Sequence, residues 1–503
     1  MLRRTVAISL VLLGAALLPA LGMAQGRNGG GAGTDTAALP AADVVTSHTI
    51  KLGERELAYT ATAGALGLGN DKGEKQAEVF FVAYTLNGAN PATRAVTFVF
   101  NGGPGAGSAY LQVGALGPRI LDFGAGRELP FTAGKIVDNP DTWLDATDLV
   151  FIDPVGTGYS RARVGNEEAQ KEFWGVRQDL DALGAIVRNA LVHLDRLTSP
   201  VYLVGESYGG FRAARLPRHL AEKQGIVVRG AVLISPVLEF ALIANGDDLS
   251  LLPWALRLPS YAAVALEAQG KLSPAALAEA ERFALGDYLT ALASPPQDAA
   301  AAQFYDRVAG FVGLPASLVA RWQGRVPLGV FVKEIRRGDG DVVSRYDGSV
   351  AAPDPYPSSA TPQGGDPILV GIDAPLTSGF VDYLRSELNY KTDRRYVLLN
   401  GALGHRWDWR GERGGPTGSV GASDDLREAL ALDPRLRILV AHGMTDLQTP
   451  YFTDRYVIAH LPAALTRDRV TLELYPGGHM MYLRPASRAA LHRDARAIYA
   501  GTE

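Results

Sequence analysis

Cysteine is absent from this sequence of 503 residues. The chain therefore forms no disulfide bond, and it has no thiolate to attack a substrate or to hold a zinc ribbon or an iron–sulfur cluster. A chain of this length can bury a core large enough to fold without covalent links, so the missing disulfides do not exclude an exported protein.

A strong net charge is absent as well. Lysine and arginine number 49, aspartate and glutamate number 53, and the formal net charge is −4. Such a chain offers no electrostatic footprint for nucleic acid, and no run of like charge is long enough for a polybasic membrane anchor. With 47% hydrophobic residues, the composition is that of a globular protein and excludes an intrinsically disordered chain.

Motifs for metals and nucleotides are missing too. None of the eight histidines belongs to an HExxH motif or to an acidic cluster at metal-ligand spacing, and there is no phosphate-binding glycine-rich loop with a lysine. We therefore expect no cofactor, neither a metal nor a nucleotide. His442 falls at the end of a predicted strand, which suits a packed residue.

The N-terminus has the pattern of an export signal. Two arginines precede the apolar run 6–18, which is short for a membrane span, and small residues stand at Gly22 and Ala24. We predict a signal peptide over residues 1–24, with Gln25 as the first mature residue. The protein is then periplasmic or secreted, without stable membrane insertion after cleavage; an uncleaved anchor is the alternative.

Short apolar runs bounded by glycine, proline or aspartate predict strands buried on both faces of a parallel sheet. Between the apolar runs 148–152 and 201–204, a helical pattern begins with Asn166 as its N-cap and carries an apolar stripe from Phe173 to Leu191. The alternation predicts an α/β fold, with a mostly parallel central sheet and helices on both faces. The runs are residues 96–100, 148–152, 201–204, 231–234, 437–440 and 470–474.

Other regions depart from this alternation. Residues 47–59 and 78–84 alternate apolar and polar side chains and predict an antiparallel element near a sheet edge. Alanine-rich helical stretches at 274–293 and 316–322 precede a polar, Gly/Pro-rich stretch at 339–367. Together, these three stretches predict a largely helical cap. The expected organisation is a flexible leader (25–45), the first part of the core (46–240), the cap or insertion (241–395) and the second part of the core (396–503).

Ser207 stands in the motif Gly-Glu-Ser-Tyr-Gly at 205–209, directly after the apolar run 201–204 and before a helical segment. A serine on a tight strand-to-helix turn needs small residues two positions before and after it, because larger side chains would clash with the neighbouring backbone. The turn exposes the Ser207 hydroxyl and directs the Tyr208 N–H toward a developing oxyanion. The alternative is a chance glycine-rich turn.

Partners for a catalytic serine follow in the order expected for an α/β-hydrolase. Asp446 comes after the run 437–440, and His479 lies on a glycine-rich loop after the run 470–474. His479 would act as general base for Ser207, and Asp446 would fix the imidazole tautomer. The alternatives are a loop-capping aspartate and a structural histidine.

These residues resemble the serine carboxypeptidase family (peptidase family S10), whose members have the α/β-hydrolase fold. The resemblance covers most of the chain after about residue 46, and generic esterases do not combine Asn-Gly-Gly-Pro-Gly with Gly-Glu-Ser-Tyr. The matching blocks are residues 101–105, 116–118, 153–160, 205–210, 443–446 and 478–480, the last followed by Pro485.

Roles for single residues follow from the resemblance. It implies that Ser207 is the nucleophile, His479 the base and Asp446 its orienting carboxylate. It further implies an oxyanion hole made by the backbone N–H groups of Gly103 and Tyr208.

Asn101 and Glu206 match family residues that hydrogen-bond the C-terminal carboxylate of the substrate. A carboxyl group beside a bound carboxylate must carry a proton to donate a hydrogen bond, and the neighbouring negative charge raises its pKa. We therefore expect activity on the acid side, lost as Glu206 ionises.

Some positions differ from the family pattern. Val99 stands where eukaryotic members have a tryptophan, and Ala115 stands where they have a second glutamate. Both family residues help to hold the substrate carboxylate, so the resemblance alone does not imply strict exopeptidase specificity for this chain. Arg119 could supply a compensating positive charge; the alternative is a solvated surface arginine.

The expected function is that of a serine-type carboxypeptidase acting on peptides or small proteins. One alternative is an esterase or acyltransferase that uses the same triad. Another is a non-catalytic binding protein on a hydrolase scaffold. The sequence makes no prediction of oligomeric state.

Overall fold

The computed structural model describes residues 37–70, 72–122, 134–243, 249–410 and 420–500. The signal peptide expected over 1–24 and most of the expected leader lie outside these residues. At the end of the leader, Leu39 is buried. The carbonyl oxygens of Ala37 and Ala38 accept hydrogen bonds from Arg394 and Thr392, so this segment contacts the core.

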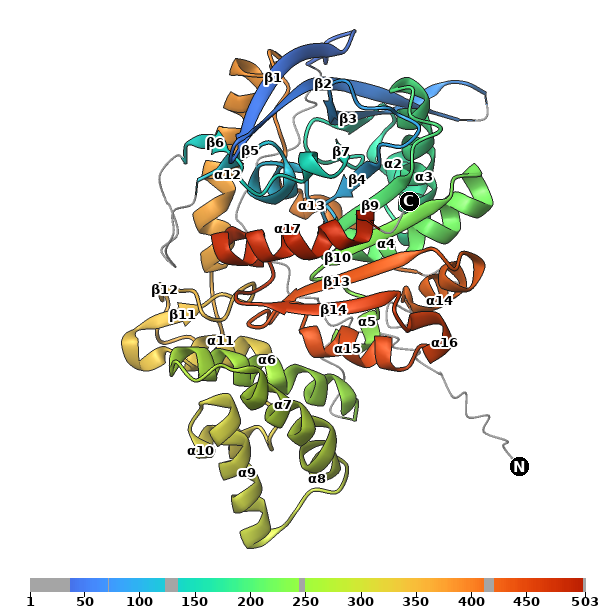
Figure 1. Ribbon diagram of the computed structural model, residues 1–503. Coiled ribbons are helices and arrows are strands. Elements are labelled where there is room, and N and C mark those ends of the chain that lie inside the picture. Colours follow the sequence, from blue (N-terminus) through green and yellow to red (C-terminus); the bar gives the residue numbers. More distant parts are fainter. Residues whose placement is uncertain (1–36, 71, 123–133, 244–248, 411–419, 501–503) are drawn as a thin grey trace, which may run out of the picture.

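A mixed sheet with the strand order β1-β2-β3-β7-β4-β9-β10-β13-β14 forms the centre of the molecule (Figure 1). The six strands from β7 to β14 are parallel and correspond to the six apolar runs, which confirms the predicted α/β fold. β1, β2 and β3 pair antiparallel at one edge, and β8 pairs with β3. The strands are β1 (Val44–Leu52), β2 (Arg55–Gly69), β3 (Lys75–Leu86), β4 (Val96–Phe100), β7 (Asp148–Ile152), β8 (Arg161–Ala162), β9 (Val201–Glu206), β10 (Val228–Ile234), β13 (Arg437–Gly443) and β14 (Val470–Tyr475).

The antiparallel element expected near a sheet edge is confirmed, and the stretch 47–59 contributes to both β1 and β2 because the chain reverses at Gly53, whose φ of +61° suits a glycine. Details of two other predictions were wrong. The single long helix is two, α2 (Asn166–Glu172) and α3 (Val176–His193), and the N-cap of α2 is Gly165 rather than Asn166. β14 is exposed on alternate residues because it forms the sheet edge, whereas burial on both faces was expected.

Helices cover both faces of the sheet. On one face, α3 and α4 (Tyr208–His219) pack against it through an apolar cluster that includes Leu180 and Phe211. On the other face, α12 (Pro367–Ser386) and α17 (Pro485–Ala500) pack through Phe380 and Leu491, and α17 crosses β10, β13 and β14 (Figure 1). None of the helices in the described part of the chain combines the length and apolar character needed to cross a membrane.

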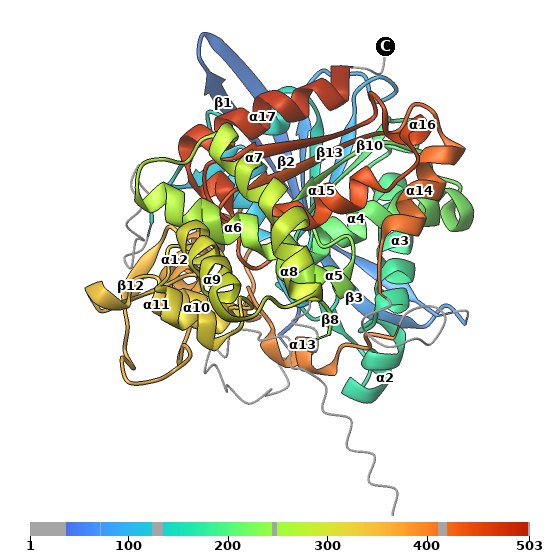
Figure 2. The ribbon, with the colours of Figure 1, turned by 90° about the horizontal axis from the view of Figure 1, so that it is seen from below.

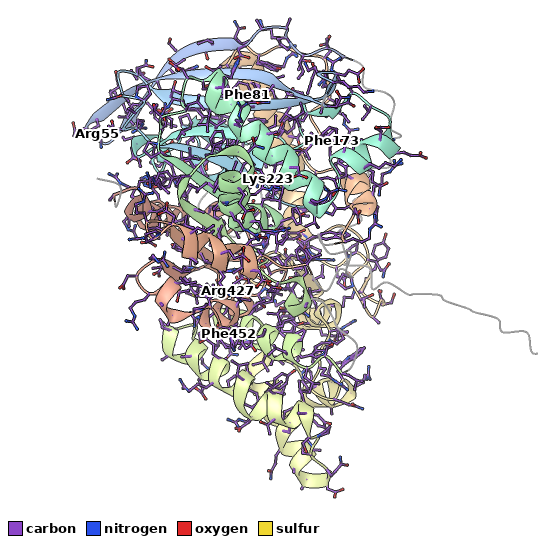
Figure 3. All side chains as sticks on the ribbon, turned by 90° about the vertical axis from the view of Figure 1, so that its right-hand side faces the viewer. Arg55, Phe81, Phe173, Lys223, Arg427 and Phe452 are labelled. Atoms are coloured by element: carbon purple, nitrogen blue, oxygen red, sulfur yellow. The ribbon has the colours of Figure 1, made fainter. Side chains whose placement is uncertain are left out.

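The segment expected to be a cap contains two differently packed parts. Helices α6 to α11 build an apolar cluster of their own, which also takes in Leu447, Tyr451 and Phe452 from the segment after β13 (Figure 2). Figure 3 shows Phe452 beside these helices and Phe81 of β3 at the opposite end of the molecule. In contrast, α12 belongs to the core of the sheet through residues such as Ile372. The domain boundaries themselves stay a prediction.

The remaining elements connect these layers. The helices are α1 (Ala109–Leu111), η1 (Gln112–Leu116), η2 (Trp143–Asp145), η3 (Leu220–Gln224), α5 (Phe240–Ile243), α6 (Leu252–Ala268), α7 (Pro274–Phe283), η4 (Ala284–Tyr288), α8 (Leu289–Ala293), α9 (Asp298–Val312), α10 (Ala316–Arg321), α11 (Leu328–Glu334), η5 (Arg337–Asp339), α13 (Gly401–Arg406), α14 (Ser423–Leu432), α15 (Tyr451–Ala459), α16 (Ala463–Thr466) and η7 (Met481–Leu483). Two short hairpins complete them, β5 (Arg119–Leu121) with β6 (Ile136–Asp138), and β11 (Asp341–Val343) with β12 (Ala351–Pro353).

Candidate active site

The predicted site residues follow the carboxyl ends of parallel strands. Asn101 comes after β4, Ser207 after β9, Asp446 after β13 and His479 after β14. The carboxyl ends of parallel strands lie at one edge of a sheet, where α/β proteins place their ligand sites. The fold therefore brings together residues that are hundreds of positions apart in sequence.

Ser207 occupies a strained turn between β9 and α4. Its φ of 60° and ψ of −122° are rare for a residue with a side chain. A Cβ atom on Gly205 would lie 1.9 Å from the Gly209 carbonyl oxygen, and one on Gly209 would lie 2.4 Å from that of Phe100. The two glycines of the motif are thus required by the turn, which leaves the Ser207 side chain half-buried.

His479 and Asp446 form a buried pair. The Nδ1 atom of His479 lies 2.8 Å from Oδ2 of Asp446. Asp446 is fully buried and also accepts hydrogen bonds from the backbone amides of Gln448 (2.8 Å) and Thr449 (2.9 Å) and from the Thr449 hydroxyl (2.7 Å). These donors hold the carboxylate in one position, so it can orient the imidazole.

Opposing effects act on the pKa of His479. Burial disfavours the imidazolium, but the charge and hydrogen bond of Asp446, with the charge of Glu206, outweigh burial and raise this pKa above its usual value. The imidazole is therefore a stronger base than a free histidine.

The loops of Ser207 and His479 are anchored at the end of β10. The Ser207 amide donates to the Ile234 carbonyl (2.9 Å), and the next residue, Ser235, donates its hydroxyl to the His479 carbonyl (2.9 Å). Since both loops share this attachment, the serine and the histidine are held at the same end of the sheet.

The backbone amide of Tyr208 and the loop after β4 lie beside Ser207. Tyr208 is the first residue of α4, so its N–H has no partner within the helix. A Cβ atom on Gly102 would lie 2.7 Å from the Tyr208 nitrogen and 2.9 Å from the Ser207 Cβ. The loop after β4 therefore packs directly against the turn at Gly102, and Gly103 is the next residue of that loop.

Glu206 precedes the serine and is held through both of its oxygens. The Asn101 side-chain amide donates to Oε2, and the Tyr482 hydroxyl donates to Oε1 (2.8 Å). Burial raises the pKa of Glu206 to about 7, although a positive His479 and the two hydrogen bonds act against this rise. Glu206 can therefore carry a proton in weakly acidic solution, where an exposed glutamate is ionised.

A turn of the predicted cap reaches the site, which the sequence reasoning missed. Tyr346, between β11 and β12, packs its ring edge-on against His479, with centroids 5.4 Å apart. Next to it, Asp347 accepts hydrogen bonds from Thr445 (2.6 Å) and Arg484 (2.8 Å). The Asp347-Gly348 dipeptide is a turn signal. It does not indicate which loop the turn contacts.

The expected role of Arg119 is not supported. Its guanidinium donates to Asp138 and to Glu387 (2.8 Å for the second), so its charge is balanced by two carboxylates. It is also not a solvated surface arginine, since its side chain is only 23% exposed. Val99 and Ala115 are buried and add no polar group to the site.

The other histidine near the strand ends is packed, as expected. His442 is fully buried, and its Nε2 atom lies 2.8 Å from Oδ2 of Asp454. Within the described ranges, no three side chains of histidine, aspartate or glutamate form a group that could hold a metal ion.

Comparison with known proteins agrees with the resemblance. A family model described as serine carboxypeptidase matches residues 57–240, which include Asn101, Glu206 and Ser207. The human retinoid-inducible serine carboxypeptidase is 31% identical over 140 residues, 28% of either chain. A probable serine carboxypeptidase of Arthroderma benhamiae is 26% identical over 177 residues, which are 32% of this chain and 30% of that protein. The matched segments span less than half the length of these relatives.

Solved structures include a relative of the same overall shape. The crystal structure of KEX1ΔP, a prohormone-processing carboxypeptidase from Saccharomyces cerevisiae, has a TM-score of 0.53 and 16% identity, and covers 88% of this chain and 91% of that one. At this identity the likeness shows the fold alone, which is the α/β-hydrolase fold. The family model and the curated relatives show that the described core around Ser207 is similar to serine carboxypeptidases over part of the chain.

Proposed function

We propose that this protein is a member of the serine carboxypeptidase family and removes residues from the carboxyl end of peptides through an acyl-enzyme on Ser207. The observation that carries the proposal is the position of Glu206. A buried carboxyl group with a pKa of about 7, bonded to Asn101, directly precedes the nucleophile. Such a group can donate a hydrogen bond to a carboxylate at the end of a substrate.

The proposed reaction begins with attack of the Ser207 hydroxyl on the scissile carbonyl. His479 takes the serine proton, and Asp446, 2.8 Å from Nδ1, stabilises the imidazolium. The amides of Tyr208 and Gly103 stabilise the oxyanion, which is worth several kcal/mol in enzymes of this type. His479 then gives the proton to the leaving amine, and water hydrolyses the acyl-enzyme by the same steps.

Selection of the chain end would depend on the protonation of Glu206. When protonated, Glu206 donates to the substrate carboxylate, and the Asn101 amide helps to hold it. When ionised, Glu206 repels that carboxylate. Because the pKa of Glu206 is about 7, the proposal gives an activity that falls as the pH rises through neutrality.

The test compares a blocked dipeptide that has a free C-terminal carboxylate with its C-terminal amide across pH 4–8. We expect the wild type to cleave the free acid, most rapidly on the acid side, and the Ser207→Ala variant to cleave neither substrate. Equal cleavage of the free acid and the amide would contradict carboxypeptidase specificity.

The absence of the tryptophan and the second glutamate of the family pattern favours one alternative, an esterase or acyltransferase with the same triad. Val99 and Ala115 bring no hydrogen-bond donor to the substrate carboxylate, and Tyr482 occupies one oxygen of Glu206. Hydrolysis of simple acyl esters without any preference for a free carboxylate would support this alternative. An organophosphate-type probe tests the binding-protein alternative. That alternative predicts that Ser207 stays unlabelled, whereas a catalytic Ser207 reacts with the probe.

We further propose that the protein is exported and acts on peptides or small proteins, with no nucleic-acid partner. The arginines and the apolar run at the N-terminus support this proposal. Mass spectrometry of the protein from separated cell fractions should find Gln25 as its first residue. A chain that keeps its first 24 residues and stays with the membrane would support the uncleaved anchor instead.

A further inference from the structure

The loops that carry His479 and Asp446 pack against each other with no room for a side chain between their backbones. A Cβ atom on Gly443, at the end of β13, would lie 1.9 Å from the carbonyl oxygen of Gly478. The position of the imidazole relative to its carboxylate therefore depends on how these two loops are held together.

The turn between β11 and β12 is bonded to both loops through its backbone. The carbonyl oxygen of Tyr346 accepts a hydrogen bond from the amide of His479, and the amide of Gly348 donates to the carbonyl oxygen of Thr445 (3.0 Å). One turn of the predicted cap thus contacts the histidine itself and the residue before Asp446.

Asp347 lies between those two contacts and bonds to both sides through its carboxylate. Oδ1 accepts a hydrogen bond from the hydroxyl of Thr445 (2.6 Å). Oδ2 accepts one from the guanidinium of Arg484 (2.8 Å), which follows His479 by five residues. Asp347 is 6% exposed and Thr445 is fully buried, so water competes little for these bonds.

The guanidinium of Arg484 is itself fixed by two segments of the cap. It donates to the Ser349 hydroxyl on the same turn, and to Glu267 on α6 (3.0 Å). Hydrogen bonds between charged groups are stronger and more directional than those between neutral groups. The segment after His479 is therefore attached to the cap at more than one point.

We propose that Asp347 is a positioning residue, which acts with Thr445 and Arg484 to hold the loops of Asp446 and His479 in the arrangement needed for proton transfer. The inference rests on the proposed function for the catalytic use of the triad, but not on the proposed preference for a free carboxylate. In enzymes, a misplacement of about 1 Å costs about 100-fold in rate.

The test measures kcat and KM for the blocked dipeptide free acid in three variants, Thr445→Val, Asp347→Asn and Arg484→Met. We expect kcat to fall about tenfold or more in each, with KM within about twofold of the wild-type value. Thr445→Ser keeps the hydroxyl and should restore kcat. The control Asp287→Asn breaks an exposed ion pair with Arg307 on the cap and should leave kcat unchanged.

The acid limb of the pH profile reports the contact between His479 and Asp446. Burial lowers the pKa of His479, and Asp446 and Glu206 raise it above its usual value. The phenol ring of Tyr346, uncharged in this range, packs against the imidazole. A weaker bond to Asp446 would lower this pKa, so the acid limb of kcat/KM should move to lower pH.

The direction of that movement separates positioning from a simple effect of charge. Positioning predicts a shift to lower pH in both Asp347→Asn and Arg484→Met, because either change loosens the same loops. An effect of charge alone would move the limb to lower pH when Asp347 is neutralised, and to higher pH when Arg484 is. Shifts in opposite directions would therefore overturn the inference.

The variant Thr445→Val keeps the test open if the charge variants fail to fold, since it removes one hydroxyl and no charge. A kcat unchanged in Thr445→Val, with a wild-type thermal midpoint, would overturn the inference while the proposed function stands. A simple acyl ester is measured in parallel. If the wild type hydrolyses only the ester, the proposed function fails, and the same comparison of kcat on the ester decides the inference.

Discussion

Replacing Glu206 with glutamine tests the chemistry of the site most directly. Glutamine keeps a similar size and can still bond with Asn101 and Tyr482, but it cannot ionise. In the wild type, the pKa of about 7 means that only about a tenth of the molecules have a protonated Glu206 at pH 8. If protonated Glu206 binds the substrate carboxylate, kcat/KM falls about tenfold for each further pH unit, whereas Glu206→Gln loses none of this binding.

The same substitution also acts on the acid limb of the pH profile. The charge of Glu206 helps to raise the pKa of His479, and glutamine removes this contribution. The pKa of His479 should therefore fall, and the neutral base should persist to lower pH. Because Glu206 and His479 interact, the wild-type limbs report the pair rather than either residue alone. The variant should have a profile that is wider on both sides.

The assay measures kcat/KM for the blocked dipeptide free acid from pH 4 to pH 9, which reports the ionisations of the free enzyme. The matching amide is the control, since it lacks the carboxylate that Glu206 would bind. An alkaline limb that stays in place in Glu206→Gln would refute the role of Glu206. Movement of the acid limb alone would show that Glu206 acts on His479 but not on the substrate.

Three more substitutions, with one control, test how the candidate site and the core beside it are held. Asp446→Asn should lower kcat by about 10³- to 10⁴-fold with little change in KM, because asparagine no longer fixes the imidazole tautomer that accepts the serine proton. A change in KM with kcat unaltered would contradict this role. Arg212→Met should reduce the free energy of unfolding, measured with urea, by about 3–5 kcal/mol, because it leaves Asp179 buried without its bidentate partner. Gly205→Ala should prevent folding, since its Cβ would lie 1.9 Å from a backbone oxygen, whereas Gly310→Ala in α9 meets nothing within 4 Å and should gain about 1 kcal/mol. Equal thermal midpoints for these two alanine variants would refute the steric argument.

Most of the sheet, and the positions where its parallel strands end, could be predicted from the sequence. A strand buried on both faces must be a continuous apolar run, and such runs predicted the six parallel strands. The predicted catalytic residues follow those runs within a few positions, so motif and topology supported one another. Two boundaries between elements were not predicted, because a single residue sets each of them. Gly53 reverses the chain within an alternating pattern, and Gly175 precedes a new helix within an apolar stripe.

Residues that surround the site were not predictable in the same way. Tyr482 and Tyr346 come from two different segments, and neither belongs to a motif with a fixed spacing. Their contacts depend on how η7 and the β11–β12 turn pack, which hydrophobic periodicity does not determine. The segment 241–395 broke the sheet pattern and therefore gave no register from which to place a side chain.

Tyr482 offers a physical reason why Ala115 is compatible with a carboxylate grip. A second carboxyl group beside Glu206 would share its proton, and the pair would titrate as a unit. A phenol instead donates a hydrogen bond to Glu206 and remains uncharged throughout the working range, since burial and the charge of Glu206 raise the pKa of Tyr482 well above its usual value. Under the proposed function, the proton that would bind the substrate carboxylate is then shared with no second carboxyl group. The alkaline loss of activity should therefore involve Glu206 and its coupling to His479, without the titration of a further carboxyl group.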